Sequence, residues 1–493
     1  MSDAQDTRPP RDDAAPIDTL IIGDGALGRW TALTLAERDP DRHVVMVAPA
    51  EGRGAASRAA GAMLGCFGEV TTDTLADPPG QDRFAIGLAA HRRWPEVLQR
   101  LRGWAGELSE ELHHVPDTYV VLNSCGSAMD SENFLALRDA LERFDEPHDE
   151  VDPTRVPGMR PRPDGRPLRA LHLPYEGAVD GRQVLRLIGW AAARAGVEHV
   201  DAAVTELRAD DDTVVVRTDD GRQLIARQVV VAAGAVSGRL LESALGEHAV
   251  MPVLAGAGQA VVARRVVGEP FTSVVRTTNR SGACGLHLVP LPQGREYLGA
   301  TNVLFAEPEL DTYLGVGHFV VGCAVTQLDE QVFLHRVHEW RMGNRPVPLD
   351  GYPLLGPTAI PLIHALTGTY RDGFHAAPVL AEHTADQLLG GAGTLDVTRF
   401  APQRAPISTG SVDAAVAEYV RHLEAGWFEA GASQPLHTST RELATHFDRE
   451  ARALYRDRLG DTIGLGPDVL MFLLASRKSP MDVDRIAAYL DRW

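Results

Sequence analysis

Three closely spaced glycines near the N-terminus constrain the fold of this chain more than any other feature. Gly23, Gly25 and Gly28 follow the apolar residues 20–22 and precede a stretch with the apolar spacing of a helix. After a strand, the first glycine permits a tight turn, the second lets the backbone approach a pyrophosphate, and the third lets helix and strand pack closely. The segment therefore predicts a Rossmann-type βαβ unit that binds a dinucleotide, although a glycine-rich turn of another α/β protein remains an alternative.

Two residues depart from the usual fingerprint. Asp24 places a carboxylate near the expected pyrophosphate, so its side chain is expected to point away. At the end of the next strand, where an Asp or Glu usually holds a ribose, the chain has Ala48, and Glu51 is the nearest acid. These departures weaken the fingerprint as a sign of dinucleotide binding, so other segments must support it.

Length and charge limit the classes of protein and partner. The 493 residues exceed the size at which a single hydrophobic core usually stops growing, so more than one structural unit is expected. A formal net charge of -19 argues against nucleic acid and anionic membranes as partners, because both attract clustered Lys and Arg. Residues 1–15 are rich in Asp, Pro and Arg and are expected to form a disordered lead-in. No signal peptide, membrane-spanning stretch or metal-ligand motif is recognised, so a cytoplasmic protein without a metal site is expected.

A run of small residues follows the second predicted strand. Residues 52–70 read GRGAASRAAGAMLGCFGEV, in which Ala62 separates Gly61 from Met63. Small side chains suit a backbone that passes close to a planar flavin ring, whereas an alanine-rich helix start is the simpler alternative. The segment resembles the flavin-contacting loop of the D-amino acid oxidase and glycine oxidase superfamily, where a Gly-Ala-Ser run precedes Ala-Ala-Gly-Met-Leu.

Later segments resemble the same superfamily in the same order along the chain, over about residues 17–400. Residues 226–240, ARQVVVAAGAVSGRL, resemble the late strand that passes near the flavin nucleotide. Residues 343–390 resemble the closing signature, an Arg-Pro-x-x-x-Asp-Gly-x-Pro stretch followed by Gly-x-x-Arg-x-Gly and a long helix. That helix is expected to begin near Ala377 and Pro378, with its positive N-terminus stabilising the anionic reduced flavin.

The resemblance implies an α/β fold in which an inserted, mostly antiparallel β-sheet substrate domain interrupts a Rossmann-type (GR2-like) FAD-binding domain. A helical C-terminal appendage at residues 406–493 lies outside the resemblance and is expected to pack on the fold or to mediate a homo-oligomer. The expected boundaries are residues 16–75, 165–245 and 346–405 for the FAD-binding domain, and residues 76–164 and 246–345 for the substrate domain.

FAD is the cofactor that the resemblance implies. Non-covalent binding is expected because no cysteine follows soon after Arg345, where the covalent members of the superfamily attach it. Each expected contact is carried over from a matching position of the superfamily's motifs. The expected FAD-binding residues are Gly23, Gly25, Ala26, Leu27, Gly28, Ala48, Ser57, Arg58, Gly61, Ala62, Met63, Val204, Ala233, Gly234, Arg345, Asp372, Gly373, Phe374 and His375.

Two arginines are the expected catalytic residues. Arg345 occupies the superfamily position where a guanidinium holds the substrate carboxylate through bidentate hydrogen bonds, and Arg371 occupies the second arginine of the glycine-oxidase-like pattern. A structural salt bridge is the alternative for each. The resemblance implies hydride transfer from the α-carbon of an amine or amino acid to flavin N5, with oxygen as the acceptor and an imine and hydrogen peroxide as the products.

Three departures from the superfamily indicate an unusual substrate. Ala48 lacks the ribose acid, Thr369 replaces a usual histidine, and a long helical tail follows the FAD-binding domain. We therefore expect a specialised amine or amino acid as substrate, in specialised metabolism. Two alternatives stay open: a dehydrogenase that passes electrons from FAD to a quinone or protein, and a flavin-binding assembly protein whose substrate site has decayed. A flavin monooxygenase fits the glycine fingerprint alone, but the closing signature disfavours it.

Overall fold

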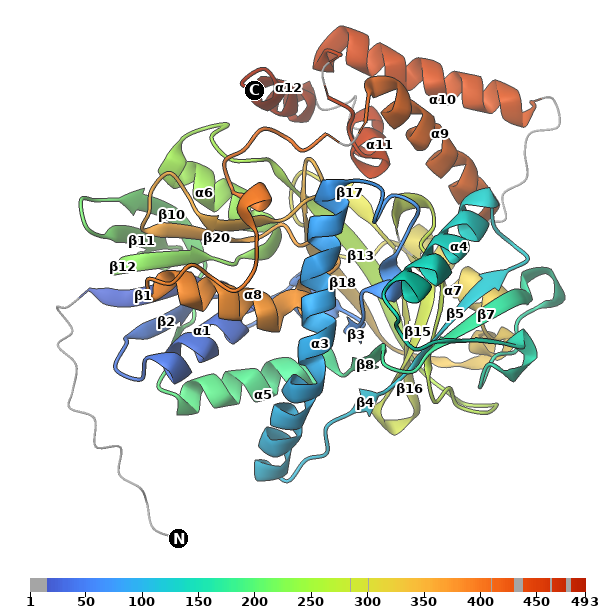
Figure 1. Cartoon of the computed structure of the whole chain (residues 1–493), viewed down its shortest axis with the longest axis horizontal. Helices are drawn as coiled ribbons and strands as arrows, with labels where there is room; N and C mark the ends of the chain where they lie inside the picture. The colour runs from blue at the N-terminus through green and yellow to red at the C-terminus, as the bar shows by residue number, and fades with distance from the viewer. Residues whose placement is uncertain are drawn as a thin grey trace.

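The structure is a computed structural model in which two large β-sheets lie next to each other and the C-terminal helices gather at one end (Figure 1). The lead-in predicted at residues 1–15 lies outside the described residues. The structure describes residues 16–283, 285–299, 301–408, 410–429, 438–461, 463–475 and 480–493.

The first sheet has the parallel order of a Rossmann-type domain. β1 (Ile17–Ile22) lies between β12 (Gln223–Val231) and β2 (Val44–Val47) and is parallel to both. β20 (Ile363–Thr367) is the parallel neighbour of β12 on its other side, so the carboxyl ends of these four strands share one edge. The remaining strands of this sheet are β9 (Glu198–Val200), β10 (Val204–Ala209), β11 (Val214–Thr218) and β19 (Leu354–Pro357).

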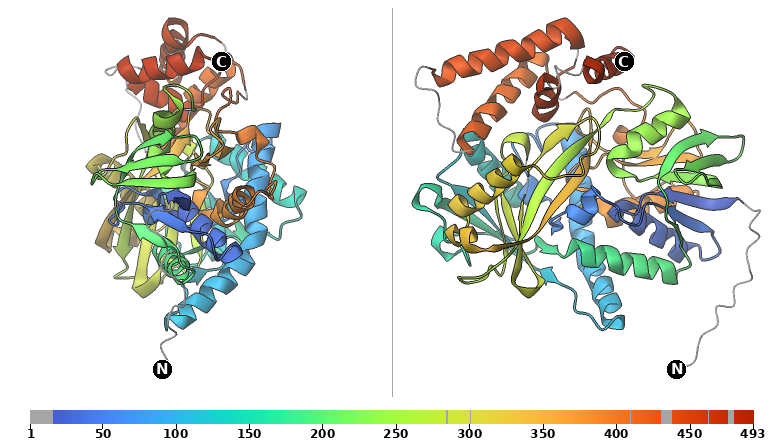
Figure 2. Two further views of the ribbon diagram at one scale, coloured as in Figure 1. Left: turned by 90° about the vertical axis from the view of Figure 1, so that its left-hand side faces the viewer. Right: turned by 180° about the vertical axis from the view of Figure 1, so that it is seen from behind.

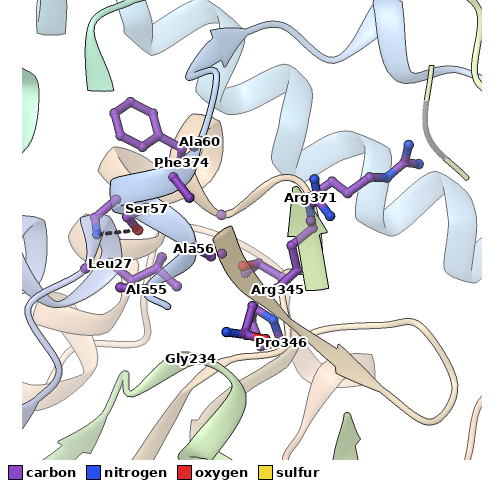
Figure 3. Close-up of a pocket in the computed structure, with 18 of the residues that line it drawn as sticks. Leu27, Ala55, Ala56, Ser57, Ala60, Gly234, Arg345, Pro346, Arg371 and Phe374 are labelled. Atoms are coloured by element: carbon purple, nitrogen blue, oxygen red, sulfur yellow. Dashed lines mark hydrogen bonds between the residues drawn. The ribbon is translucent and has the colours of Figure 1, made fainter. Parts of the chain in front are cut away.

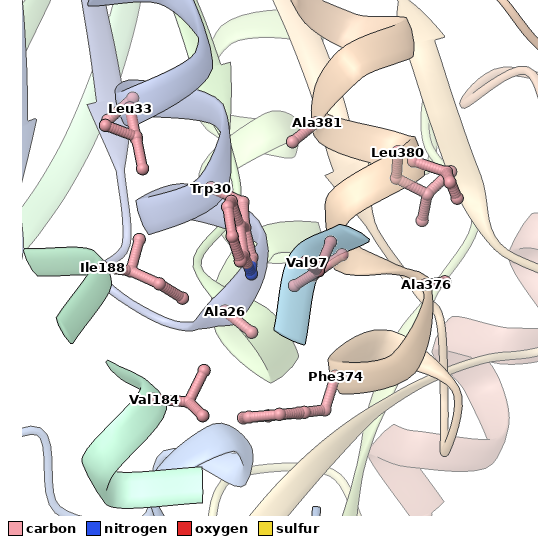
Figure 4. Packing of buried hydrophobic residues seen from close by; sticks show 14 of the residues in the cluster. Ala26, Trp30, Leu33, Val97, Val184, Ile188, Phe374, Ala376, Leu380 and Ala381 are labelled. Carbon is pink, nitrogen blue, oxygen red and sulfur yellow. The ribbon is translucent and has the colours of Figure 1, made fainter. Parts of the chain in front are cut away.

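Packed helices flank this sheet and share one apolar cluster. Trp30, Val97 and Leu380 come from three different helices and are buried together (Figure 4). Burying a side chain of this size contributes about 1.5–3 kcal/mol, so the cluster holds the first sheet and its helices together. The helices are α1 (Ala26–Arg38), α3 (Pro78–Glu107), α5 (Gly181–Arg194) and α8 (Gly373–Leu388).

Gly23 and Gly28 allow β1 and α1 to meet closely. Gly23 has a φ of 112°, a backbone conformation that side chains disfavour. A Cβ at residue 28 would lie 2.0 Å from the carbonyl oxygen of Gly23, so the helix could not approach the turn with any larger residue there. Local geometry therefore accounts for the first and third glycines of the fingerprint.

Helix α8 begins one turn earlier than expected. It starts at Gly373, so the predicted start near Ala377 and Pro378 is wrong. Proline commonly marks the first turn because it lacks an N–H. Here the turn before the proline also forms, since the Asp372 carbonyl accepts the Ala376 N–H at 2.8 Å. Packing of α8 against α1 offsets the loss of the one backbone hydrogen bond that Pro378 cannot donate.

The second sheet is mostly antiparallel, as predicted. β18 (Arg336–Pro348) runs antiparallel to β13 (Val253–Arg264), whereas β14 and β5 form a parallel pair. β7 belongs to this sheet although it lies within residues 165–245, which were predicted for the FAD-binding domain, and the domain boundaries stay a prediction. The other strands are β5 (Thr118–Asn123), β6 (Asp149–Val151), β7 (Pro167–Leu173), β14 (Val274–Thr277), β15 (His287–Leu291), β16 (Arg295–Gly299) and β17 (Val303–Phe305).

Short elements connect the two sheets. β3, β8 and β4 form a small third sheet, and the remaining helices before the C-terminal extension lie mainly around the second sheet and at the end of the first (Figure 1). These elements are α2 (Ala56–Ala59), β3 (Met63–Leu64), β4 (His114–Val115), α4 (Ala128–Arg143), β8 (Gly177–Val179), α6 (Ser237–Leu245) and α7 (Leu314–Gln327).

The C-terminal extension is helical, as predicted, and it packs on the main fold (Figure 2). Val416, Tyr455 and Leu470 are buried in the same apolar cluster as Leu20 of the first sheet. A homo-oligomer formed through the extension stays a prediction. No helix among the described residues combines the length and apolar character needed to cross a bilayer. The helices of the extension are α9 (Val412–Glu429), α10 (Thr440–Leu454), α11 (Pro467–Ala475) and α12 (Pro480–Leu490).

Candidate active site

A cavity of about 630 Å³ extends from the carboxyl edge of the first sheet to the second sheet. Its wall includes Gly23 after β1, Ala48 after β2, Ala233 after β12 and Thr369 after β20. Open parallel sheets bind their ligands at this edge, and the volume lies within the range of small-molecule sites.

Most of the expected FAD-binding residues line this cavity, and so does the second predicted arginine, Arg371. Gly28 and Arg58 are not among the lining residues. A place in the wall does not identify a ligand, so contact of each residue with FAD stays a prediction. The expected residues that line the cavity are Gly23, Gly25, Ala26, Leu27, Ala48, Ser57, Gly61, Ala62, Met63, Val204, Ala233, Gly234, Arg345, Asp372, Gly373, Phe374 and His375.

The N-terminus of α1 faces the cavity. The Ala26 N–H donates to Ser57 Oγ at 3.0 Å, which holds α2 against the start of α1 (Figure 3). A helix N-terminus surrounded by small side chains offers positive potential and a close backbone approach to an anion. The residues present therefore fit the pyrophosphate of FAD.

Asp24, the unfavourable residue of the fingerprint, is buried and paired with two arginines. Its Oδ2 lies 2.8 Å from Arg29 Nη2 and 2.7 Å from Arg58 Nη2. These guanidinium groups offset the negative charge beside the helix start. The expected conflict with a pyrophosphate is thus reduced by charge pairing, and Arg58 acts on this carboxylate instead of lining the cavity.

The start of α8 forms another part of the wall. The Asp372 carboxylate pairs with Arg83 Nη2 at 2.7 Å, and His375 Nε2 donates to the carbonyl of Gly87 at 2.9 Å. Burial lowers the pKa of His375 to about 4, so its ring is neutral near pH 7. The positive end of α8 is therefore accompanied by a neutral imidazole and a paired carboxylate.

Arg345 and Arg371 reach the same part of the cavity from different elements (Figure 3). Arg345 lies in β18, and its Nη1 donates to the Thr301 carbonyl at 2.8 Å and, more weakly, to Asn302 Oδ1 at 3.4 Å. Among the described residues, no carboxylate forms an ion pair with Arg345. Its guanidinium charge is therefore not neutralised by a described side chain.

Arg371 belongs to a partly buried polar network that also includes Arg276. Glu69 Oε1 lies 2.6 Å from Arg276 Nη1, and Oε2 lies 3.0 Å from Arg371 Nη1. Asn279 Oδ1 accepts a hydrogen bond from each arginine, at 2.9 Å and 3.0 Å. All four residues line the cavity. The salt-bridge alternative considered for Arg371 is thus part of its environment.

The charge balance of this network favours an anionic ligand. Burial alone would raise the pKa of Glu69, but Arg276 and Arg371 outweigh burial and hold the pKa well below its ordinary value. Glu69 is therefore ionised and pairs with both Arg276 and Arg371, whereas Arg345 of the same wall forms no ion pair with a described carboxylate. The remaining positive charge attracts carboxylates.

A neutral histidine completes this end of the cavity. His287 Nδ1 lies 3.1 Å from the Gly285 carbonyl, which only accepts, so Nδ1 carries the proton and Nε2 carries a lone pair. Burial, followed by the nearby charge of Arg276, lowers the pKa of His287 to about 4. Its ring stacks on Tyr297 with 5.6 Å between ring centroids. The pair forms a flat, neutral wall, in which Nε2 of His287 is an acceptor.

The buried Glu176 fixes the turn that carries Glu69. Its carboxylate accepts the backbone N–H groups of Cys66, Phe67 and Gly68 at 2.6 to 2.8 Å. Burial raises the pKa of Glu176, while these hydrogen bonds and His91 oppose the increase. The backbone around Glu69 is therefore held rigidly at the cavity wall.

Sequence reasoning missed Glu69, Arg276, Asn279 and His287. Glu69 is the single acid in residues 52–70, and Arg276 is the one charged residue in the apolar strand β14, so an isolated charge was the available signal. Nothing local distinguished Asn279 or His287. Among the described residues, no group of three or more His, Cys, Asp or Glu side chains could hold a metal ion.

Comparison with known proteins assigns the chain to a family. The profile of the family described as DAO, FAD dependent oxidoreductase, matches residues 18–387. The chain belongs to this family. It is therefore an enzyme that uses FAD for oxidation and reduction, as expected, and the extension at residues 406–493 lies beyond the DAO match.

Curated relatives of this DAO chain are longer proteins. The bifunctional protein ThiO/ThiG of Nostoc sp. is 28% identical over 217 residues, which are 43% of this chain and 31% of that protein. The bifunctional protein ThiO/ThiG of Synechocystis sp. is 25% identical over 400 residues, which are 78% of this chain and 54% of that protein. The chain thus matches less than two thirds of the length of these relatives.

Solved DAO-like structures share the fold. Glycine oxidase from Geobacillus kaustophilus superposes with a TM-score of 0.66 and 22% identity, covering 78% of this chain and 98% of that one. Iminodiacetate oxidase from Chelativorans sp. gives a TM-score of 0.65 and 21% identity, with coverage of 78% and 98%. At this level of identity, the similarity confirms the α/β fold.

Proposed function

We propose that this DAO-family enzyme oxidises the C–N bond of an amino acid or of a related amine that carries a carboxylate. The observation that carries the proposal is the guanidinium of Arg345, which lines the cavity without an ion-pair partner among the described residues. Arg276 and Arg371 add positive potential because they share one carboxylate. A substrate carboxylate would balance this charge, and a guanidinium suits it through two parallel hydrogen bonds.

The chain's own groups bind and orient the substrate. Positive potential from the arginines disfavours an ammonium group, so the amine binds neutral and its lone pair is available to form the C=N bond as the hydride leaves with its electron pair. His287 Nε2 can accept one amine N–H and so turn the α-carbon hydrogen toward the flavin. When bound, FAD would supply a hydride acceptor at N5 and, with oxygen as the final acceptor, the products would be an imine and hydrogen peroxide.

Several observations support the finer parts of the proposal. Similar folds include proteins named glycine oxidase and iminodiacetate oxidase, which agrees with an amino-compound substrate. No cysteine is among the described lining residues, which favours non-covalent FAD. Ala48 and Thr369, together with the extension, depart from the superfamily and favour a specialised substrate, and we place the enzyme in specialised metabolism.

The test is anaerobic reduction of the purified yellow protein by a panel of amino acids, N-substituted amino acids and amines without a carboxylate. We expect carboxylate-bearing amines to bleach the flavin. Arg345→Met should raise their KM by roughly 100-fold, because a charge-assisted hydrogen bond contributes about 1.5–3 kcal/mol. Unchanged reduction in that variant would refute the proposed role. Rapid dye reduction without hydrogen peroxide in air would favour a dehydrogenase instead.

A further inference from the structure

The C-terminal extension contacts two segments of the cavity wall. α9 and α11 lie against the body of the fold, and α10 lies farther out (Figure 1). None of the described lining residues belongs to residues 406–493, so the extension acts on the cavity only through intermediate residues. These contacts lie beyond the residues that match the DAO family.

The first contact runs from α11 to Arg345. The Tyr370 hydroxyl donates to Asp468 Oδ2 at 2.9 Å, and it accepts a hydrogen bond from Asn302 Nδ2 at 2.7 Å. Asn302 Oδ1 in turn faces Arg345 Nη1 at 3.4 Å. A series of hydrogen bonds therefore links Arg345, the predicted substrate arginine, to Asp468. The Asp468 carboxylate accepts the last hydrogen bond of this series.

Tyr370 also contacts the second arginine and has an unusual backbone. The carbon of the Arg371 guanidinium lies 5.5 Å from the centre of the Tyr370 ring. Tyr370 has a φ of 52°, a left-handed conformation that is rare for a bulky residue and persists only when surrounding contacts hold it. Its N–H donates to the Pro346 carbonyl at 3.1 Å, and Asp468 fixes its other end. Tyr370, which precedes Arg371, is therefore held by hydrogen bonds both at its backbone N–H and at its side-chain hydroxyl.

The second contact runs from α9 to the loop that carries Asn279. Glu429 accepts the N–H and the hydroxyl of Ser281, each at 3.0 Å. His422 Nδ1 accepts the Gly282 N–H at 3.2 Å. The same loop positions Asn279, whose Oδ1 binds Arg371. Both substrate arginines are therefore connected to the extension by hydrogen-bonded neighbours.

We propose that the C-terminal extension positions the substrate site from outside the cavity, with Asp468 acting through Tyr370 as a positioning residue for Arg345 and Arg371. The proposal rests on the proposed function of the two arginines. A residue in this role holds the guanidinium groups in the orientation that a carboxylate requires, without touching the substrate. The enzyme's preference for carboxylate-bearing amines thus depends on a helix that follows the FAD-binding domain.

The test uses the full-length, FAD-loaded enzyme with Asp468→Asn and Tyr370→Phe. Tyr370→Phe keeps the ring and removes the hydroxyl that contacts both Asp468 and Asn302. Asp457→Asn is the matched control, because Asp457 lies in the extension and pairs with its exposed neighbour Arg456. Three quantities are measured for each variant: kcat and KM for the best carboxylate-bearing amine, the same constants for an amine without a carboxylate, and the Kd of acetate from the change in the flavin spectrum.

The expected result is selective. Asp468→Asn and Tyr370→Phe should each raise the KM of the carboxylate-bearing amine and the Kd of acetate roughly tenfold, the loss of about one hydrogen bond. Turnover of the amine without a carboxylate and the melting temperature should change little, and the control should match the wild type.

Two results would overturn the inference. One is an unchanged KM and acetate Kd in both variants; the other is an equal loss for both kinds of amine, which indicates general damage to the fold. Arg345→Met separates the two proposals. If it leaves KM unchanged, the proposed function fails, whereas a large effect of Arg345→Met with no effect of Asp468→Asn refutes the positioning role alone.

Discussion

The carboxylate of Glu429 makes the docking of the extension depend on pH. Its side chain is buried, with 8% of the residue exposed, and it accepts two hydrogen bonds from Ser281. Burial raises the pKa of Glu429 to about 7, although the charge of Arg280 opposes this increase. The perturbation that tests this feature is Glu429→Gln, because the amide is neutral at every pH and its oxygen can still accept the Ser281 N–H.

The pKa difference sets the sign and size of the effect. An exposed glutamate in the unfolded chain has its ordinary pKa of 4.5, so the folded state binds more protons between about pH 4.5 and 7. The contribution of Glu429 to stability is complete below pH 4.5 and is lost as the pH rises through about 7. With about 1.4 kcal/mol for each pH unit, the loss is about 3 kcal/mol.

Thermal unfolding and hydrogen exchange in α9, followed from pH 5 to pH 8, measure this loss. Glu429→Gln should resemble the wild type near pH 5 and exceed its stability by up to about 3 kcal/mol at pH 8. Buried histidines such as His287 titrate in both proteins, so their effect cancels in the difference. Glu424→Gln on the same helix is the control. Parallel stability curves for Glu429→Gln and the wild type would refute the reasoning.

Other predictions concern the cofactor end and the charged end of the cavity. Gly28→Val should lower flavin content, because its Cβ would meet the Gly23 carbonyl oxygen at 2.0 Å; full flavin absorbance per protein would contradict this. Glu69→Gln leaves the buried guanidinium of Arg276 and the half-buried one of Arg371 without their shared carboxylate and should reduce the free energy of unfolding by about 3 kcal/mol in denaturant titrations. The pKa of His287 is about 4 in the fold, below its ordinary 6.5, so stability should fall as the pH drops from 6.5 to 4. His287→Asn should remove up to about 3 kcal/mol of that loss, and an unaltered acid transition would disprove it.

Features encoded by neighbouring residues were predicted from the sequence. The turn from Gly23 to Gly28 follows from backbone geometry that only glycine allows, and the family assignment followed from residues 52–70 and 343–390. The residues around Arg345 form a continuous motif, which singled it out as a candidate, and it lines the cavity. In each case the signal lies within one short segment of chain.

Features that depend on distant contacts could not be predicted. Glu69 and Arg276 are separated by more than 200 positions. They meet because Arg276 lies in β14, which pairs with β5, and Glu69 lies in the turn before α3, which packs close to that strand. The pairing of Asp24 with Arg58, 34 positions later, likewise lay outside the fingerprint, although it reduces the conflict with a pyrophosphate that the fingerprint raised. The start of α8 was misjudged because a proline rule is local, whereas tertiary packing determined the helix boundary.

The strand order of the first sheet limits when the enzyme can assemble. β1 is made first, but its parallel neighbour β12 follows some 200 residues later, and β20 comes later still. Pairings over such separations form slowly, because a long loop must close before any contact stabilises it. During synthesis, the side of β1 that faces β12 therefore stays unpaired after β2 has been made. α11, which contacts Tyr370 through Asp468, emerges later again, so this support for the residue before Arg371 forms only after the strands of both sheets have been made.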